Sequence, residues 1–310
     1  MISRRNIRVK VMQTLYSIDS VSDNTLSAEA ISILTKKIEL TRRLFTYLVY
    51  FITEVARYAE TDARKKASKY LPTAADLNIS TKVAGNEHLW KILDDSSFKS
   101  VVAEEKLSAI VDIELLKKTY QQLVKTPEYE EYVEVQSRDK KNEKKILEII
   151  FNNLMLPNDD FINHVEEYFI NWDDDAEMMQ ALVLNYLGKP GVQSFHDILS
   201  KEKWDFARGL LTTVIEKADQ SLELIKPKLK NWDADRIASL DMILLQMGVC
   251  EFLYFETIPT KVTINEYIDL AKAYSTPQSG QFVNGLLDNI HKELAEEKKI
   301  EKISFRNSTL

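Results

Sequence analysis

Glycine and proline are scarce in this chain, and their scarcity constrains the fold more than any other feature of the sequence. The 310 residues include 7 glycines and 7 prolines, less than half of the combined share of about 12% in an average protein. Tight turns and strand ends depend on these two residues, so few of either can form. Because 45% of the residues are hydrophobic, the chain can still bury a core. The sequence therefore predicts an all-α protein built from long helices.

The charge and the cysteine content exclude several classes of protein. A formal net charge of −7 argues against a protein that is basic throughout, so any site for a polyanion must be local. A single cysteine, Cys250, cannot form an internal disulfide, and we expect a reducing, cytoplasmic location. Residues 237–255 are the most apolar stretch, but they contain Asp241, Gln246 and Glu251. We therefore expect a buried core helix there and no membrane span.

The first 18 residues read as a basic amphipathic helix, with Ser3 as a possible N-cap. This segment contains no acidic residue and four cations, namely Arg4, Arg5, Arg8 and Lys10. Cations in the first turn oppose the helix macrodipole, so they are poorly explained as stabilisers of the helix. The planar fork of arginine suits phosphate, which favours RNA or another polyanion as a partner. A frayed, solvated terminus and a mitochondrial transit peptide are the alternatives.

The rest of the chain reads as a series of helices. Residues 26–200 predict successive helices, such as 38–58 and 107–123. Residues 204–294 are more sharply divided, and there we expect a helix over about 206–229, an apolar helix from about Asp235 to before Pro259, a helix ending near Tyr274 and a last helix after it. Thr263 and Glu266 have the spacing of a capping box, and Thr276 with Pro277 has the pattern of a helix start. Together with the N-terminal helix, these would close a small bundle.

Catalytic patterns are missing from the sequence. The four histidines (His88, His164, His196 and His291) are scattered, no H-E-x-x-H or C-x-x-C motif occurs, and 188–191 lacks the spacing of a phosphate-binding loop. We expect Cys250 to be an inert core thiol, and we interpret 173–177 and 138–145 as solvated charged segments. Gly285 lies inside a helical pattern, where it indicates either close helix packing or the approach of a ligand. The sequence therefore predicts no enzyme, no catalytic residue, no metal and no cofactor.

Two parts of the sequence resemble the NusB family of transcription antitermination factors. The first is Arg4-Arg5-Asn6-Ile7-Arg8 followed by Gln13-Thr14-Leu15-Tyr16. The second is Ile258-Pro259-Thr260-Lys261-Val262 with Ile264-Asn265-Glu266, and then Phe282-Val283-Asn284-Gly285-Leu286-Leu287-Asp288. The matched stretches, 1–18 and 204–294, make up about a third of the chain.

The resemblance implies an all-helical NusB-like bundle that binds the boxA segment of nascent RNA. It also implies a partner, the small-subunit ribosomal protein called NusE, and a role in the RNA polymerase antitermination complex during ribosomal RNA transcription. The positions that match the family's RNA-contacting segments are Arg4, Arg5, Arg8, Tyr16, Lys272, Ser279, Phe282 and Asn284. Asp241 falls on the surface that the family turns towards NusE.

The resemblance also suggests how the chain is divided. We expect a basic helix of the bundle over 1–19, a helical insertion of unknown role over 20–203, the remainder of the bundle over 204–295 and a charged tail over 296–310. Two other functions stay open. One is a helical protein–protein adaptor of the transcription machinery that has lost RNA binding. The other is an RNA-modifying enzyme, although the low glycine count and the absence of β–α alternation argue against its catalytic fold.

Overall fold

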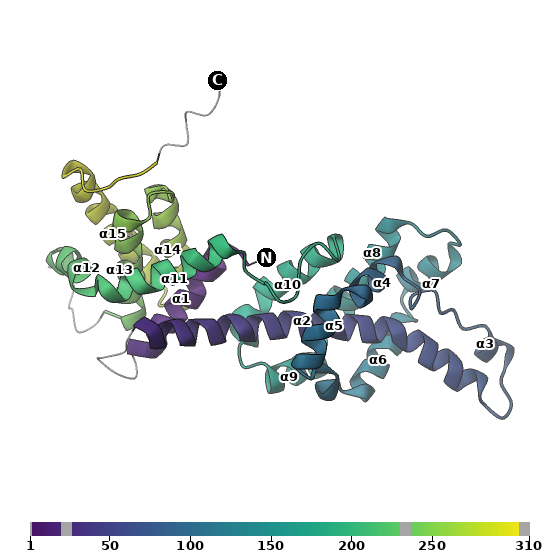
Figure 1. Cartoon of the computed structure of the whole chain (residues 1–310). Helices are drawn as coiled ribbons and strands as arrows, with labels where there is room; N and C mark the ends of the chain where they lie inside the picture. Colours follow the sequence, from purple (N-terminus) through teal and green to yellow (C-terminus); the bar gives the residue numbers. More distant parts are fainter. Residues whose placement is uncertain (1, 20–26, 230–236, 304–310) are drawn as a thin grey trace, which may run out of the picture. The chain divides into compact units, whose positions relative to one another are not determined.

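All regular structure described in the chain is helical. The computed structural model describes residues 2–19, 27–229 and 237–303, and it contains no strand within these ranges. The all-α prediction is therefore confirmed. The chain divides into two compact units (Figure 1). Unit 1 consists of Met1–Ile2 and Ile38–Ile198, and unit 2 consists of Ser3–Lys37 and Leu199–Leu310.

Unit 2 joins the start of the chain to its last third. The helices of this unit are α1 (Arg4–Asp19), the first part of α2 (Ser27–Ala67), α11 (Lys201–Glu216), α12 (Ala218–Ile225), the 3₁₀ turn η3 (Lys226–Leu229), α13 (Ser239–Tyr254), α14 (Thr260–Tyr274) and α15 (Ser279–Glu296). The apolar helix α13 lies at the centre and packs against α1, α11, α12, α14 and α15. Its side chains are buried on nearly all sides, including Leu244, Met247 and Phe252. A helix that is apolar all round is stable only when other helices enclose it, so α13 organises the core of unit 2.

Unit 1 is built on the long helix α2, which contributes residues from Ile38 onwards. The other elements are α3 (Ala74–Leu77), α4 (Glu87–Asp94), α5 (Ser96–Glu104), η1 (Leu107–Ile110), α6 (Ile113–Leu123), α7 (Pro127–Glu134), α8 (Lys140–Ile149), the π-helical turn η2 (Ile150–Met155), α9 (Asp159–Tyr168) and α10 (Trp172–Gly188). Aromatic rings of α2 pack against the helices around it, and the ring centroids of Phe51 and Phe161 lie 4.9 Å apart. Such pairs contribute about 0.5–1.5 kcal/mol beyond the area that they bury.

The predicted helix boundaries hold in some places and fail in others. Ser3 caps α1 as predicted, because its Oγ accepts a hydrogen bond from the backbone N–H of Asn6 at 3.1 Å. The expected capping box at Thr263 is wrong, since α14 already begins at Thr260 and the Thr263 hydroxyl donates to Glu251 instead. The last helix starts at Ser279 and not at Pro277. The predicted helix over 206–229 is broken after Glu216, and the predicted start of the apolar helix near Asp235 lies outside the described residues.

The two charged segments expected to be solvated each provide one buried carboxylate. Asp175 in α10 is 1% exposed, and its Oδ2 accepts hydrogen bonds from Thr41 at 2.9 Å and from Asn171 at 2.6 Å. Glu143 in α8 is also 1% exposed and accepts a hydrogen bond from the hydroxyl of Tyr132 at 2.8 Å. In these places the acidic residue stabilises the packing of unit 1, so the interpretation of both segments as wholly solvated is wrong.

Candidate nucleic-acid interface

The first turn of α1 presents two arginines at the surface of unit 2. The side chains of Arg4 and Arg5 are 40% and 42% exposed. Arg4 donates to Glu202 of α11 at 2.6 Å, and Arg5 approaches Asp269 of α14 at 3.4 Å. Exposed ion pairs of this kind contribute at most about 1 kcal/mol. Both guanidinium groups can therefore exchange their carboxylate partner for another anion at little cost.

Arg8 lies one turn further along α1 but has a different environment. Its side chain is 2% exposed, and its Nε and Nη2 donate to the two carboxylate oxygens of Glu251 at 2.7 and 3.0 Å. Its Nη1 lies 3.4 Å from Glu266. Burial lowers the pKa of Arg8, but the hydrogen bonds and the charge of Glu251 outweigh burial, and the pKa lies above its ordinary value. The fork of Arg8 is occupied inside the protein and is not available to a phosphate in this structure.

Glu251 has further partners that complete this buried cluster. The hydroxyl of Thr263 donates to it at 3.0 Å, and the hydroxyl of Tyr267 donates to it at 2.8 Å. Burial, followed by the charge of Glu251, raises the pKa of Tyr267 well above its ordinary value, so this phenol remains a hydrogen-bond donor. The guanidinium of Arg8 also lies over the ring of Phe206, 5.5 Å from its centroid. The cluster fixes α1 to α13 and α14 in the core of unit 2.

The second predicted region lies at the junction of α14 and α15. Lys272 is exposed on α14, and its aliphatic stem packs on Gly280, because a Cβ atom placed there would lie 2.7 Å from Cγ of Lys272. Asn284 is exposed on α15 one turn later, where residues four apart share a face of the helix. Ser279 and Phe282 are instead 1% and 6% exposed. Neither of these two side chains lies open to a ligand in this structure.

Asp241 holds the beginning of α15 in place. Its Oδ2 accepts a hydrogen bond from the Ser279 hydroxyl at 2.6 Å, and the residue is 5% exposed. Its Oδ1 is also buried, and no donor among the described residues reaches it. The expected partner-facing residue and one expected RNA-contacting residue thus bond to each other below the surface.

The exposed members of the predicted site lie on helices that contact one another. Arg5 reaches Asp269, which is 264 positions away in the sequence, and Lys272 lies on α14 three residues after Asp269, on the same side of that helix. Tyr16 is 47% exposed and follows Arg5 by about three helical turns, so both lie on one side of α1. We call the five exposed residues the α1–α14–α15 face. Its members are Arg5, Tyr16, Lys272 and Asn284, with Arg4 at the edge towards α11, where it pairs with Glu202.

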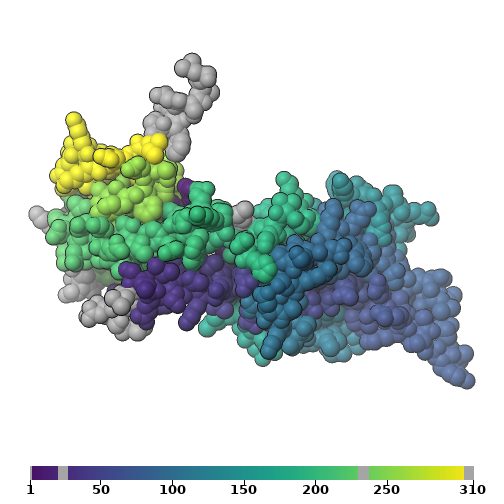
Figure 2. All heavy atoms as spheres, viewed as in Figure 1, coloured from purple at the N-terminus to yellow at the C-terminus, as the bar shows by residue number. Residues whose placement is uncertain are grey.

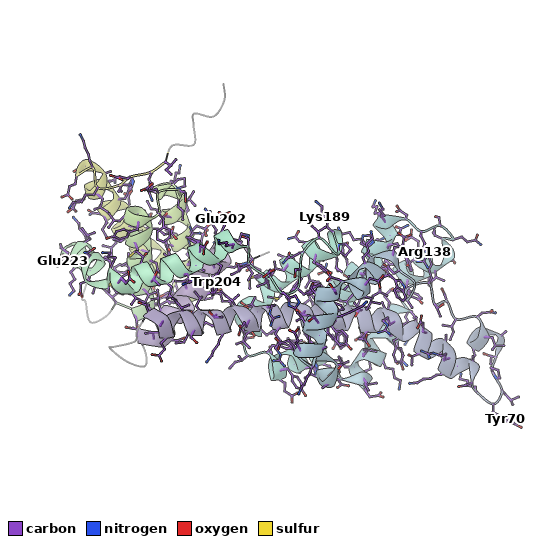
Figure 3. The ribbon with its side chains drawn as sticks, viewed as in Figure 1. Tyr70, Arg138, Lys189, Glu202, Trp204 and Glu223 are labelled. Carbon is purple, nitrogen blue, oxygen red and sulfur yellow. The ribbon has the colours of Figure 1, made fainter. Side chains whose placement is uncertain are left out.

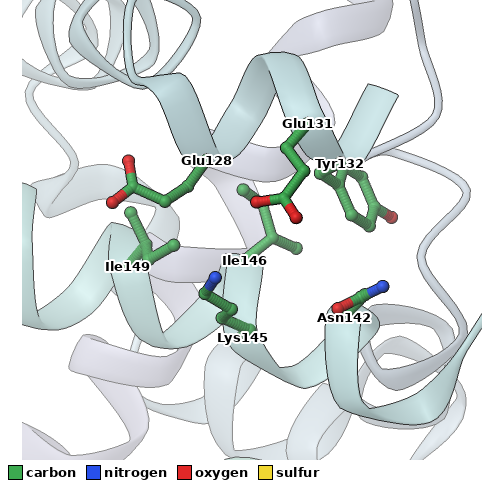
Figure 4. A pocket seen from close by; sticks show the side chains of 7 residues that line it. All are labelled: Glu128, Glu131, Tyr132, Asn142, Lys145, Ile146 and Ile149. Atoms are coloured by element: carbon green, nitrogen blue, oxygen red, sulfur yellow. The ribbon is translucent and has the colours of Figure 1, made fainter. Parts of the chain in front are cut away.

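Three hollows lie among the described residues of unit 1. A hollow between α7 and α8 (Figure 4) has a volume of about 20 Å³, enough for a single water molecule. Two open depressions of unit 1 have volumes of about 360 and 700 Å³. No serine, threonine or cysteine lines either depression. No group of three or more potential metal ligands occurs in the described part of the chain.

Cys250 and the apolar helix that carries it belong to the core. Burial raises the pKa of the Cys250 thiol to about 12, which leaves it protonated and unreactive at neutral pH. Among the described helices, none is both long enough and apolar enough to cross a bilayer.

A Cβ atom at Gly285 would have no neighbour within 4 Å, so the interpretation of this glycine as a close-packing position is wrong.

Comparison with known proteins points to one family. A family model described as the NusB family matches residues 162–292. The transcription antitermination protein NusB of Salinibacter ruber is 41% identical over 98 residues, which cover 32% of this chain and 61% of that protein. NusB of Finegoldia magna is 42% identical over 94 residues, with 30% and 69% covered. NusB of Listeria monocytogenes serotype 4a is 36% identical over 101 residues, with 33% and 79% covered.

A solved structure of T. maritima NusB is 29% identical, and the match covers 44% of this chain and 90% of that chain with a TM-score of 0.31. The chain thus spans 61% of the length of the Salinibacter protein and somewhat more of the other two relatives. The matched residues 162–292 do not include α1. Its contacts with α11 and α13 nevertheless make α1 part of unit 2.

Proposed function

Since the chain belongs to the NusB family of transcription antitermination proteins, we propose that it is a non-enzymatic antitermination factor that binds RNA. It acts on boxA-like RNA with the ribosomal protein NusE, in the RNA polymerase antitermination complex of ribosomal RNA transcription. The observation that supports RNA binding is the α1–α14–α15 face. Arg5 and Lys272 come from opposite ends of the sequence; Arg5 pairs with Asp269, and Lys272 follows Asp269 by about one turn of α14.

The chemistry of this face suits a single strand of RNA. Arg4, Arg5 and Lys272 can each neutralise one phosphate, since their present partners are surface carboxylates or neutral groups. The half-exposed ring of Tyr16 can stack on an unpaired base. The amide of Asn284 can bond to a base edge. Arg8, Ser279 and Phe282 take part indirectly, by holding the helices that carry the exposed residues.

Fluorescence anisotropy with a labelled boxA-like RNA tests this proposal. Three neutralised phosphates should give a slope of about −2 when the logarithm of the binding constant is plotted against the logarithm of salt concentration. The titration is run with the full chain alone and with purified NusE. No binding under either condition would refute the proposal.

Charge reversal tests the face itself. The double variant Arg5→Glu, Lys272→Glu should bind RNA at least about 10-fold more weakly and show a shallower salt slope, because two phosphate contacts are lost. Lys299→Glu is the matched control, as Lys299 is also an exposed lysine of unit 2, 57% exposed and beyond the end of α15. Equal affinities of the double variant and the control would argue against this face.

The proposed contact with NusE concerns Asp241. Its buried Oδ1 has no donor among the described residues, so a partner that moves the neighbouring side chains aside and supplies an N–H group there would satisfy it. Asp241→Asn keeps an acceptor for Ser279 but replaces part of the carboxylate. Isothermal titration of NusE into this variant should show weaker binding than into the parent chain. Unchanged affinity would remove Asp241 from the proposed contact.

A protein–protein adaptor is the second candidate function. It is favoured by the carboxylates of Glu202 and Asp269, which already face Arg4 and Arg5. In this case RNA would bind no better to the parent chain than to the Arg5→Glu, Lys272→Glu variant. A complex with NusE that forms without RNA would then support the adaptor.

A further inference from the structure

The far end of helix α2 forms a projecting tip of unit 1 that the family match does not cover. We define the tip as residues 64–77, where α2 ends at Ala67 and the short helix α3 follows. Tyr70 is 97% exposed, Leu71 is 80% exposed and Leu77 is 60% exposed. Figure 3 shows Tyr70 pointing away from the rest of unit 1, and Figure 2 shows this end as a narrow projection. Side chains as exposed as those of Tyr70 and Leu71 contribute little to the packing of unit 1.

Four cations lie within six positions of Tyr70 in the sequence, namely Arg64, Lys65, Lys66 and Lys69. Lys66 and Lys69 form ion pairs with Asp62 at 2.8 Å and with Asp76 at 2.7 Å. The other two bind neutral groups only in the described contacts. The Nε of Arg64 donates to a backbone carbonyl at 3.3 Å, and the ammonium of Lys65 lies over a tyrosine ring, 5.5 Å from its centroid. The tip is therefore locally positive.

This positive charge contrasts with the remainder of unit 1. Between Ile38 and Ile198 the sequence, with the tip included, has 28 acidic and 20 basic residues, a formal charge of −8. Cations in the last turn of α2 also stabilise the helix through its macrodipole. That effect accounts for Arg64, Lys65 and Lys66, but it does not account for Lys69, Tyr70 and Leu71, which follow the end of the helix.

Hydrogen bonds hold the tip in a defined conformation. Thr73 and Asp76 form a capping box at the start of α3, in which the N–H of Asp76 donates to the Thr73 hydroxyl at 3.2 Å and the N–H of Thr73 donates to Asp76 at 3.0 Å. The same carboxylate binds Lys69. The loop that presents Tyr70 is thus fixed at both ends, so its ring is displayed at little further cost in conformational entropy.

We propose that this tip is a second binding site for single-stranded RNA, separate from the α1–α14–α15 face. The inference rests on the proposed function, because it takes RNA to be the ligand of the whole protein. A base stacks on the ring of Tyr70, and the neighbouring phosphates lie against Arg64 and Lys65. An exposed aromatic ring beside cations is the arrangement by which proteins bind single strands without reading their sequence.

The composition of the tip favours RNA over a membrane surface. Helices that bind in the interface of a bilayer present a long apolar face. The tip has three large exposed apolar side chains, and α3 is only four residues long. Tyrosine stacks well on bases, and the cations lie next to it in the sequence.

The test measures binding of an unstructured oligouridine RNA to the full chain by anisotropy. Tyr70→Ala should weaken binding about 5-fold or more, the expected loss for one stacked base. Arg64→Gln with Lys65→Gln should make the salt slope shallower by about 1.4, the value for two phosphates on a single strand. Lys117→Gln with Lys118→Gln is the matched control, since these are neighbouring exposed lysines of unit 1 that already face Glu114 and Asp160.

Photocrosslinking to an RNA that contains 4-thiouridine provides a direct measurement on the same samples. Crosslinks should form at Tyr70 and not at Tyr168, which is 39% exposed but lies next to glutamates in the sequence. The melting curve of Tyr70→Ala should match the parent, because the Tyr70 side chain is 97% exposed; Arg64→Gln with Lys65→Gln should lower the melting temperature slightly, because two cations leave the last turn of α2.

The outcomes separate this inference from the proposed function. If the parent chain binds RNA but the tip variants bind equally well, the tip inference is overturned and the proposed function stands. If only the tip variants lose binding to oligouridine, the inference stands, and the α1–α14–α15 face is judged by the boxA-like RNA. If the parent binds boxA-like RNA but not oligouridine, the tip inference is overturned and the proposed function stands. If the parent binds neither RNA, both fail. Flotation with anionic phosphatidylglycerol vesicles that depends on Tyr70, without an effect on RNA binding, would overturn the inference in favour of a membrane surface.

Discussion

The substitution Arg8→Ala should destabilise unit 2 far more than substitution of the other arginines of α1. It removes two hydrogen bonds of 2.7 and 3.0 Å to Glu251 and leaves that carboxylate, which is 0% exposed, with only Thr263 and Tyr267 as donors. Breaking a buried ion pair by removing one partner costs about 3–5 kcal/mol, because an uncompensated charge remains in the core. For a unit of this size the loss corresponds to a fall in melting temperature of about 6–20 °C.

Arg4→Ala is the matched control for this prediction. Arg4 lies on the same helix and also pairs with a glutamate, but the two side chains are 40% and 75% exposed. Its loss should therefore cost less than about 1 kcal/mol.

Hydrogen exchange measures the opening of each of the two units separately. Amides of α1 and α13 should exchange faster in Arg8→Ala, and those of α9 in unit 1 should exchange as in the parent. Calorimetry then measures the change in melting temperature. If the free energies of unfolding of Arg8→Ala and Arg4→Ala differed by less than about 1 kcal/mol, the reasoning that Arg8 is a core residue would be refuted.

Three further predictions follow from local geometry. Gly285→Ala should stabilise the protein by about 0.5–1 kcal/mol, because a Cβ atom there meets nothing within 4 Å. At Gly248 a Cβ atom would lie 2.8 Å from a buried leucine methyl group, so Gly248→Ala should lower the melting temperature. Equal changes in the melting temperatures of the two variants would contradict this reasoning. Cys250, with its pKa raised to about 12 by burial, should react with iodoacetamide at pH 8 only after denaturation, and rapid labelling of the folded chain would show that the thiol is accessible. The hydrogen bond from Lys69 is the main cause that lowers the pKa of Asp76 to about 2, from its ordinary value of 3.8. The contribution of the Asp76 carboxylate to the order of the tip should therefore be complete above pH 3.8 and disappear as the pH falls through about 2. An NMR titration of the Asp76 carboxyl group with a midpoint near 3.8 would refute this prediction.

Local patterns predict the helices of this chain but not their ends in every case. The scarcity of glycine and proline and the apolar periodicity suffice for an all-α fold, and Ser3 caps α1 as its position predicts. The spacing at Thr263 also fits a capping box, but the hydroxyl binds a buried glutamate of α13 instead. A short-range pattern cannot show this preference, because it depends on which helices meet in the core.

The candidate site shows the same limit. Arg4, Arg5 and Arg8 look equivalent in the sequence, yet the partner that draws Arg8 inside lies 243 positions later. Asp241 and Ser279 are predicted for different surfaces, and they bond to each other. The exposure of Tyr70 has no signal in the sequence beyond a helix break, since a tyrosine after a run of lysines is compatible with either a buried or an open position.

The link between Arg8 and Glu251 also affects how the chain can fold during its synthesis. At about 5–20 residues per second, the ribosome needs about 12–50 seconds to make the 243 positions that separate the two residues. Throughout that time α1 has no α13 to pack against, while Ile38–Ile198 emerges as a continuous stretch that can assemble first. In the nascent chain the basic helix α1 therefore stays without its core partner, and it can pack into unit 2 only after the last third of the chain has been translated.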